Sequence, residues 1–197
     1  MSNSSKNYDK SDEKSFEKGE LLHLFIVMGV SGSGKSSIGQ SLADELNFTF
    51  VEADDFHSQQ AKDQMADNKP LNDDMRKPWV QAIVNKLYDL HEDQKNVVLA
   101  FSGLKMLHRN NLRKTPFICH FFYLDGDNKT LMDRLLQRKS HFFSPDLLGS
   151  QFEAMESPLN SETDISLIDV NNSLFTIVQQ VFTIARHELK RIGFEKI

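Results

Sequence analysis

The stretch Gly29-Val30-Ser31-Gly32-Ser33-Gly34-Lys35-Ser36 decides the fold of this chain. It matches the pattern G-x-x-x-x-G-K-S/T of the phosphate-binding loop, or P-loop. The preceding residues 22–28 form a short apolar run, which is typical of a strand buried in a parallel sheet. Ile38, Leu42 and Leu46 follow at helical spacing. Strand, glycine-rich loop and helix together are the context that this motif requires.

Each residue type in the loop has a physical role in holding a nucleotide. Glycines let the backbone turn tightly and present N–H groups to phosphate oxygens, and the helix N-terminus adds a partial positive charge. Lys35 is expected to reach the β- and γ-phosphates and Ser36 to hold Mg²⁺, so ATP and Mg²⁺ are the predicted cofactors. The predicted nucleotide-binding residues are Gly29, Val30, Ser31, Gly32, Ser33, Gly34, Lys35, Ser36 and Ser37.

Composition limits the class of protein. The chain has 197 residues, 39% of them hydrophobic, which is enough for one globular core. The net charge of −5 gives no basic field for nucleic acid. The apolar run 21–30 is too short for a membrane span. Cys119, the single cysteine, lies in an apolar run and predicts a core residue of a reduced, cytoplasmic protein; the alternative, a reactive thiol, has no basic motif nearby.

The chain predicts one α/β domain after a polar tail. Residues 1–20 are mixed in charge and almost free of apolar side chains, so a disordered tail is expected, with a binding tail as the alternative. Strands alternate with helices from there on, which indicates a doubly wound five-stranded parallel sheet. The predicted strands cover residues 22–28, 48–52, 96–101, 118–124 and 165–169.

Several helix boundaries follow from local signals. Pro78 suits the first turn of a helix that runs to Leu90, with two aspartates at positions 73–74 near its N-terminus. Asp127 is expected to begin another helix. Further helices are predicted over 105–114, from Ser144-Pro145 onward, and over 172–192, where Gly193 closes the last one.

Two carboxylates leave the second strand at its carboxyl end, where ligands bind in open α/β sheets. Glu52 and Asp54 are two residues apart and therefore share a side in extended chain. Spacing alone leaves a solvated acidic loop equally open. However, the third strand ends in Ser102-Gly103, without the aspartate that many P-loop proteins use as a metal ligand. Glu52 or Asp54 is therefore expected to supply the carboxylate that the missing aspartate would provide.

Arginines supply candidate anion contacts. Arg76 suits either an anion clamp or a surface ion pair, and its sequence context does not separate the two. Arg134 and Arg138 are four residues apart and share one helix face, ahead of a predicted loop and a new helix. That layout is typical of a lid that closes over phosphates, predicted at about residues 139–150. His141 suits either a phosphate contact or an ordinary loop histidine.

Several stretches together resemble gluconate kinase of the thermoresistant gluconokinase type, a P-loop kinase family related to shikimate kinase. The similarity runs from about Leu24 to near the C-terminus. Its most specific parts are the PLNDD-R-PW pattern within 70–79 and the HFF and QFE stretch within 138–153. The stretches are MGVSGSGKSS at 28–37, ADDFH at 53–57, PLNDDMRKPW at 70–79, SGLK at 102–105, YLDGD at 123–127 and RKSHFFSPDLLGSQFE at 138–153.

The resemblance implies a nucleoside-monophosphate-kinase-like fold and ATP-dependent phosphorylation of D-gluconate at its 6-hydroxyl by a homodimer. By family pattern, Asp54 binds the acceptor hydroxyl and accepts its proton, Arg138 is the lid arginine, and Arg134 serves the nucleotide. The resemblance also implies that the segment at about 54–77, an excursion between the second strand and the next long helix, binds the substrate. The implied sets are catalytic Lys35, Asp54 and Arg138, acceptor-binding Asp54, His57, Arg76, Lys105 and Arg109, and metal-binding Ser36 and Glu52.

The chain departs from the family pattern mainly on the acceptor side. The family usually has aspartate where Glu52 stands, proline and asparagine where Ser58 and Ala61 stand, and CSALKK where residues 101–106 read FSGLKM. Another small sugar acid is therefore an alternative acceptor, ahead of a shikimate-like one. A nucleotide-binding regulator without turnover is the alternative from a different class. ADP release across a panel of sugar acids discriminates among them.

Overall fold

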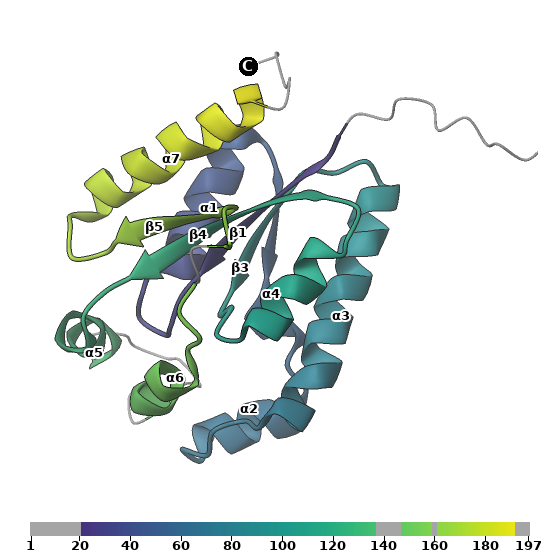
Figure 1. The fold of residues 1–197 in the computed structure, drawn as a ribbon. Helices are drawn as coiled ribbons and strands as arrows, with labels where there is room; N and C mark the ends of the chain where they lie inside the picture. The colour runs from purple at the N-terminus through teal and green to yellow at the C-terminus, as the bar shows by residue number, and fades with distance from the viewer. Residues whose placement is uncertain (1–20, 137–146, 159–160, 192–197) are drawn as a thin grey trace, which may run out of the picture.

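A five-stranded parallel sheet forms the centre of the computed structural model, which describes residues 21–136, 147–158 and 161–191 (Figure 1). The strand order is β2-β3-β1-β4-β5, so the phosphate loop leaves the central strand. All four strand pairs are parallel, which confirms the predicted sheet. The strands are β1 His23–Met28, β2 Thr49–Glu52, β3 Val97–Phe101, β4 Ile118–Asp125 and β5 Ile165–Asp169.

Helices cover both faces of the sheet (Figure 1). The helices α1 and α7 lie on one face, and α3 and α4 lie on the other. The short helices η1, α2 and α6 gather beyond the carboxyl ends of the strands. The bounds are α1 Lys35–Leu46, η1 Ala53–Phe56 (a 3₁₀ helix), α2 Gln59–Ala66, α3 Asp73–Glu92, α4 Met106–Arg113, α5 Asn128–Leu136, α6 Leu148–Ala154 and α7 Leu174–Arg191.

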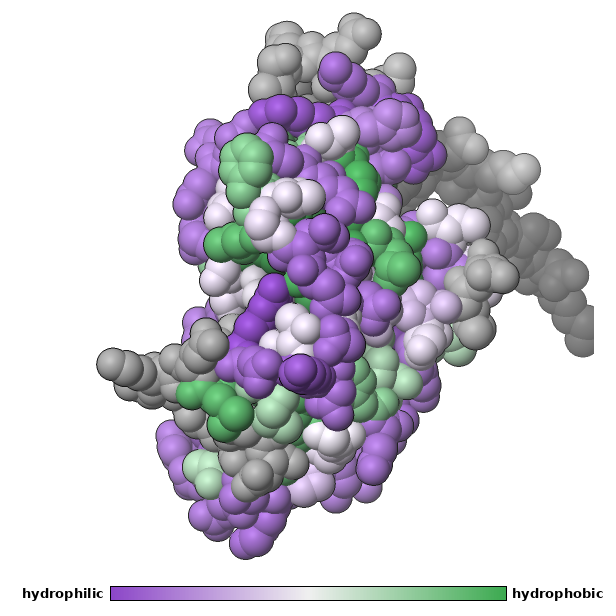
Figure 2. All heavy atoms as spheres, turned by 90° about the vertical axis from the view of Figure 1, so that its left-hand side faces the viewer, coloured by the Kyte–Doolittle hydropathy of each residue, from purple (hydrophilic) through white to green (hydrophobic). Residues whose placement is uncertain are grey.

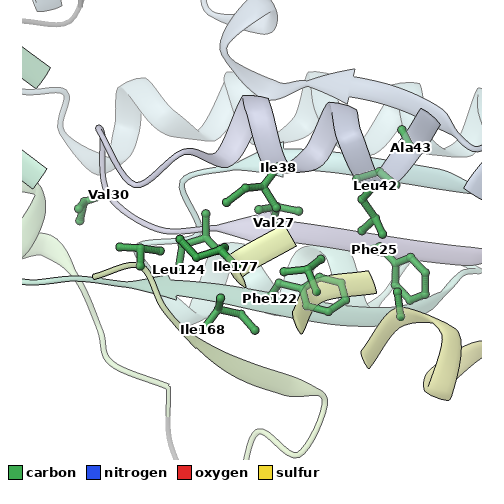
Figure 3. Close-up of a cluster of buried hydrophobic side chains, with 14 of the residues drawn as sticks. Phe25, Val27, Val30, Ile38, Leu42, Ala43, Phe122, Leu124, Ile168 and Ile177 are labelled. Carbon is green, nitrogen blue, oxygen red and sulfur yellow. The ribbon is translucent and has the colours of Figure 1, made fainter. Parts of the chain in front are cut away.

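The central strand contributes to two hydrophobic cores because successive side chains point to opposite faces. Phe25 and Val27 of β1 pack with α1 and α7, and Figure 3 shows their side chains with Ile38, Phe122 and Ile177 between sheet and helices. The alternate residues 24, 26 and 28 pack with α3 and α4. Burial on both faces explains why this strand is an unbroken apolar run.

Helix α3 begins earlier than predicted, and Pro78 lies inside it. Asn72 caps its N-terminus by accepting a hydrogen bond from Met75 N at 2.9 Å, and acidic residues occupy its first turn as expected. A proline inside a helix costs about 3 kcal/mol. Burying one large apolar side chain contributes about 1.5–3 kcal/mol, and α3 buries several, including Trp79 and Ile83. Packing and capping therefore outweigh the proline.

Of the other predicted boundaries, some lie within the described residues and others lie outside them. Asp127 accepts hydrogen bonds from Thr130 N and Thr130 Oγ1, both at 2.8 Å, and so caps α5 as predicted. The predicted tail 1–20, the helix start at Ser144-Pro145 and the closing Gly193 lie outside the described residues. Within the described part of the chain, no helix is long and apolar enough to cross a bilayer.

Cys119 is a structural residue, as predicted. It is partly buried, and its Sγ donates to Leu112 O at 3.5 Å. Burial raises the pKa of its thiol to about 12. Because the thiolate is the reactive form, this cysteine stays unreactive at neutral pH.

Acidification is expected to destabilise the fold through its buried histidines. Burial lowers the pKa of His120, although Glu188 and Asp164 raise it. The folded protein therefore keeps this ring neutral while the unfolded chain binds a proton below about pH 6.5. The neutral His120 ring therefore contributes its full share to the free energy of unfolding above that pH. This share is lost as the pH falls, by at most about 1.4 kcal/mol per pH unit. Burial lowers the pKa of His23, His57 and His108 in the same direction.

Thermal unfolding at pH 7.0 and pH 5.5 tests this expectation. His120→Gln keeps a polar partner for Ser166 Oγ, which lies 3.0 Å from His120 Nε2, but removes the titration. The variant is expected to lose less Tm on acidification than the wild type. His187→Gln is the matched control because that side chain is 73% exposed. An equal loss of Tm in the His120 variant and the wild type would contradict the account.

Candidate active site

The phosphate loop makes a tight turn between β1 and α1. A Cβ on Gly29 would lie 2.7 Å from Leu124 O, and one on Gly32 would lie 2.8 Å from Leu131 O, so neighbouring backbone requires glycine at both. Gly34, with φ of 99°, caps α1 without a side chain. The first N–H groups of α1 therefore face the loop, as anion binding requires.

Lys35 lies at this loop. Its Nζ donates to Val30 O at 3.1 Å, so the ammonium group is held beside the backbone that is predicted to bind phosphate. Lys35 also lines a polar pocket beyond the carboxyl ends of the strands. The structure thus places the predicted lysine between the loop and this pocket, which is called the acceptor pocket below.

Ser36 and Glu52, the two residues predicted to hold the metal, lie near each other. Glu52 is at the end of β2, close enough for the Ser36 hydroxyl to influence its carboxyl. Burial raises the pKa of the Glu52 carboxyl and nearby Asp54 adds to the rise, while Ser36 and Lys35 lower it. Hydroxyl and carboxylate oxygens are the ligands that Mg²⁺ prefers. Within the described residues, no group of three or more His, Cys, Asp or Glu could hold a metal without other ligands.

The acceptor pocket is lined by residues that lie far apart in the sequence. Asp54, His57 and Arg76 line it, so the structure brings these predicted acceptor residues together beside Lys35. The full lining is Ser31, Lys35, Asp54, His57, Met65, Pro70, Leu71, Arg76, Trp79, Ser102, Leu104, Leu147, Ser150 and Gln151.

A stacked aromatic pair forms one wall of this pocket. The Trp79 and His57 rings lie 4.4 Å apart at an interplanar angle of 11°, and Trp79 Nε1 donates to Ala53 O at 2.7 Å. His57 Nε2 lies 3.8 Å from Asp54 Oδ1. Burial lowers the pKa of His57, so the ring is neutral near pH 7, although Asp54 opposes the shift. Trp79 is buried, and it also lines the acceptor pocket.

Arg76 forms the ion pair that was one of its two predicted roles, and it also lines the acceptor pocket. Its Nη1 donates to Asp73 Oδ1 at 3.0 Å, and the same side chain, 16% exposed, lines the acceptor pocket. A guanidinium has five N–H donors, so one ion pair does not exhaust its capacity. Arg76 is therefore able to bind a carboxylate while Asp73 holds it.

The contacts of Arg109 differ from its predicted role as a substrate contact, because all of them are within the protein. Its side chain is fully buried and donates to Gly103 O at 2.9 Å and Glu156 O at 3.1 Å. It also forms a bidentate pair with Glu162 at 2.9 and 2.7 Å. With its guanidinium engaged on these partners, Arg109 does not line the acceptor pocket, and the structure gives no support to its predicted role as a substrate contact.

Lys105 likewise does not line the acceptor pocket. Its Nζ lies 3.4 Å from Glu156 Oε1, and its residue caps the start of α4. The preceding residue, Leu104, lines the pocket instead. The structure therefore gives no support to the predicted substrate contact of Lys105.

A second pocket lies beside the phosphate loop and the start of α1 and α7. Arg134 lines it, as expected for a nucleotide contact, and its Nη2 donates to Val170 O at 2.7 Å. Figure 2 shows the face formed by α5, β5 and α7, where hydrophobic and hydrophilic residues are mixed. Leu174 of this pocket and neighbouring Phe175 are exposed there. Arg138 and most of the predicted lid lie outside the described residues.

Sequence reasoning missed Gln151, a residue of α6. Its Oε1 accepts a hydrogen bond from Ser31 N of the phosphate loop at 2.6 Å, across 120 positions of sequence. The stretch QFE was part of the family resemblance, but no spacing or residue type pointed to a contact with the loop. Only the fold brings α6 to this place.

Fold and site together define a P-loop kinase that acts on a small molecule. A phosphate loop on the central parallel strand, carboxylates after β2 and a separate polar pocket beside the loop are its parts. Residues 31–185 match the family model for shikimate kinase. The chain belongs to the gluconokinase family.

Known relatives support that assignment over most of their length. The chain is 40% identical to "Thermosensitive gluconokinase" of Escherichia coli, covering 79% of this chain and 83% of the relative. It is 35% identical to "Thermoresistant gluconokinase" of the same organism, covering 83% and 94%. A solved gluconokinase structure from Sinorhizobium meliloti superposes with a TM-score of 0.78 at 32% identity, covering 90% and 99%.

Proposed function

We propose that this protein transfers the γ-phosphoryl group of ATP to the 6-hydroxyl of D-gluconate, releasing ADP and 6-phospho-D-gluconate. One observation carries the proposal in a chain of this family. Lys35 and Ser31 of the phosphate loop line the same pocket as Asp54 and Arg76. An anionic, hydroxyl-bearing acceptor in that pocket would lie directly against a nucleotide on the loop.

The chemistry asks mainly for positioning and charge stabilisation, because phosphoryl transfer passes through a loose transition state. Asp54 is proposed to aim the acceptor hydroxyl in line with the γ-phosphorus and to accept its proton. Lys35 and the N–H groups of the loop neutralise charge on the transferring group. Arg138 is proposed to close over the phosphates as part of the lid. Arg134 and the second pocket serve the nucleoside end of ATP.

Mg²⁺ is proposed as the metal, held through Ser36 and Glu52. The donor set fits this ion, which takes one or two carboxylates, substrate phosphates and several waters. When bound, Mg²⁺ would neutralise phosphate charge during transfer. Ser36 lies near enough to Glu52 for its hydroxyl to lower the pKa of the Glu52 carboxyl, so both oxygen donors lie at the end of the loop.

The family resemblance also supports finer proposals on the protein's setting. We propose a homodimer in the cytoplasm with small-molecule substrates and no nucleic acid or membrane partner. A kinase for another small sugar acid and a nucleotide-binding regulator are the competing functions. ADP release measured with and without D-gluconate tests them: gluconate-dependent release is expected, and release that gluconate does not stimulate would contradict the proposal.

Arg76→Lys is expected to raise KM for gluconate about tenfold and to leave KM for ATP nearly unchanged. The planar guanidinium donates two parallel hydrogen bonds to a carboxylate, which an ammonium cannot do, and a bond to a charged group contributes about 1.5–3 kcal/mol. Steady-state kinetics with each substrate varied measures both constants. Lys77→Ala, at an exposed neighbouring position outside the acceptor pocket, is the control. A change confined to the ATP constant would move Arg76 to the nucleotide side.

A further inference from the structure

Gln151 has a defined orientation at the boundary between phosphate loop and acceptor pocket. A backbone N–H can only donate, so the atom 2.6 Å from Ser31 N must be the side-chain oxygen Oε1. The other end of the planar amide is the Nε2 group, which carries two N–H donors. The phosphate loop therefore sets which end of Gln151 is left for other partners.

Gln151 is one of the residues that line the acceptor pocket, together with Asp54 and Arg76. No residue in the described part of the chain accepts a hydrogen bond from Gln151 Nε2. Gln151 is only partly buried, so its Nε2 donors are available to a ligand or to water. The carboxylate and hydroxyl oxygens of a sugar acid are acceptors for these donors.

The helix that carries Gln151 is fixed on both sides. Leu147, just before α6, packs with Met65 and Leu71, which joins α6 to the α2 region across the pocket. Beyond α6, Glu156 N donates to Leu104 O at 2.8 Å, and Met106 N donates to Glu156 Oε2 at 2.7 Å.

Arg109 completes this anchor. It donates to the carbonyls of both Gly103 and Glu156, and so ties the loop after β3 to the segment after α6. Both segments contribute to the acceptor pocket or its support. A side chain carried on such a fixed element is preorganised for recognition.

We propose that Gln151 is a specificity-determining contact for the acceptor, donating from Nε2 to an oxygen of the sugar acid while Ser31 N–H holds its Oε1. The inference rests on the proposed function and adds a residue to it. The Gln151 side chain then connects the phosphate loop, which is proposed to hold the γ-phosphate, with the sugar acid that accepts this phosphate. A hydrogen-bond donor in this place favours oxygen-rich anionic acceptors.

Two variants separate the two ends of the amide. Gln151→Glu keeps an oxygen for Ser31 N–H but replaces the donor with an acceptor, whereas Gln151→Met removes both. Trp79 is the only tryptophan of the chain and lines the pocket, so its fluorescence reports gluconate binding without turnover. Both variants are expected to bind gluconate about tenfold more weakly. KM for ATP should stay within about twofold.

A control variant on α7 and three contrary outcomes complete this test. Gln180→Glu makes the same change at an exposed position of α7 and should bind gluconate as the wild type does. Wild-type gluconate binding in the Glu variant would show that Gln151 only caps the phosphate loop, and would overturn the inference. A defect confined to KM for ATP would also overturn it. A wild-type protein that neither binds gluconate nor releases ADP with it would instead refute the proposed function, and the inference with it.

Discussion

Lys35→Ala is expected to lower kcat for gluconate phosphorylation by about 10²–10³-fold while the protein remains folded. Removing one preorganised donor from developing charge has an effect of that size. The structure holds the Lys35 ammonium at the phosphate loop through Val30 O and places it at the edge of the acceptor pocket. The loop backbone does not depend on this single contact, because glycines and the cap of α1 set its path.

Coupled ADP release and circular dichroism test this expectation together. Lys95→Ala, at an exposed position away from both pockets, serves as the control and should keep wild-type kcat. If Lys35→Ala folds and turns over within about threefold of the wild type, the assignment of the lysine to the transferring phosphoryl group is wrong.

Asp54→Asn is expected to lower kcat by about 10²–10⁴-fold, the usual contribution of a positioned general base, with KM for ATP retained. Asparagine preserves the shape of the side chain but has no negative charge with which to accept the hydroxyl proton. Asp54 is carried by η1 directly after β2, so the sheet fixes its position beside Lys35. Asp55→Asn changes the exposed neighbour in the same helix and should have little effect.

Glu52 is expected to respond differently from Asp54. Glu52 lies near Ser36, the other proposed metal ligand, so Glu52→Gln should mainly raise the Mg²⁺ concentration needed for activity. Titration of Mg²⁺ at saturating ATP and gluconate compares the two variants. Recovery of Asp54→Asn but not Glu52→Gln at high Mg²⁺ would mean that the two roles are reversed.

The sequence predicted the sheet well because its signals are local. An apolar run, a glycine-rich loop and a helical repeat are all readable within the first strand, loop and helix, and parallel packing follows from their alternation. Pro78 shows where local signals compete. The rule that proline favours a first turn is sound, but Asn72 supplies a stronger cap six residues earlier, and the buried face of α3 absorbs the interruption.

The candidate site was predictable where residues lie on the phosphate loop or directly after β2. It was not predictable where tertiary contacts decide a role. The family resemblance assigned both Arg109 and Arg76 to the acceptor, yet Arg109 is hydrogen-bonded to Glu162 and two carbonyls while Arg76 lines the pocket. The contact of Gln151 could not be predicted, because its partner is a backbone N–H. Every residue except proline has such a group, so no residue type in the sequence points to Ser31 as the partner.

A competition experiment tests the central claim most directly. The purified protein is given limiting ATP and an equimolar mixture of D-gluconate, other aldonic acids and shikimate, and the phosphorylated products are identified by mass spectrometry and NMR. The product ratio reports the ratio of kcat/KM values among acceptors. We expect 6-phospho-D-gluconate to exceed every other product by about tenfold or more. Predominance of another phosphorylated acid, or no phosphorylated acid at all, would contradict the assignment of this protein as a gluconate kinase.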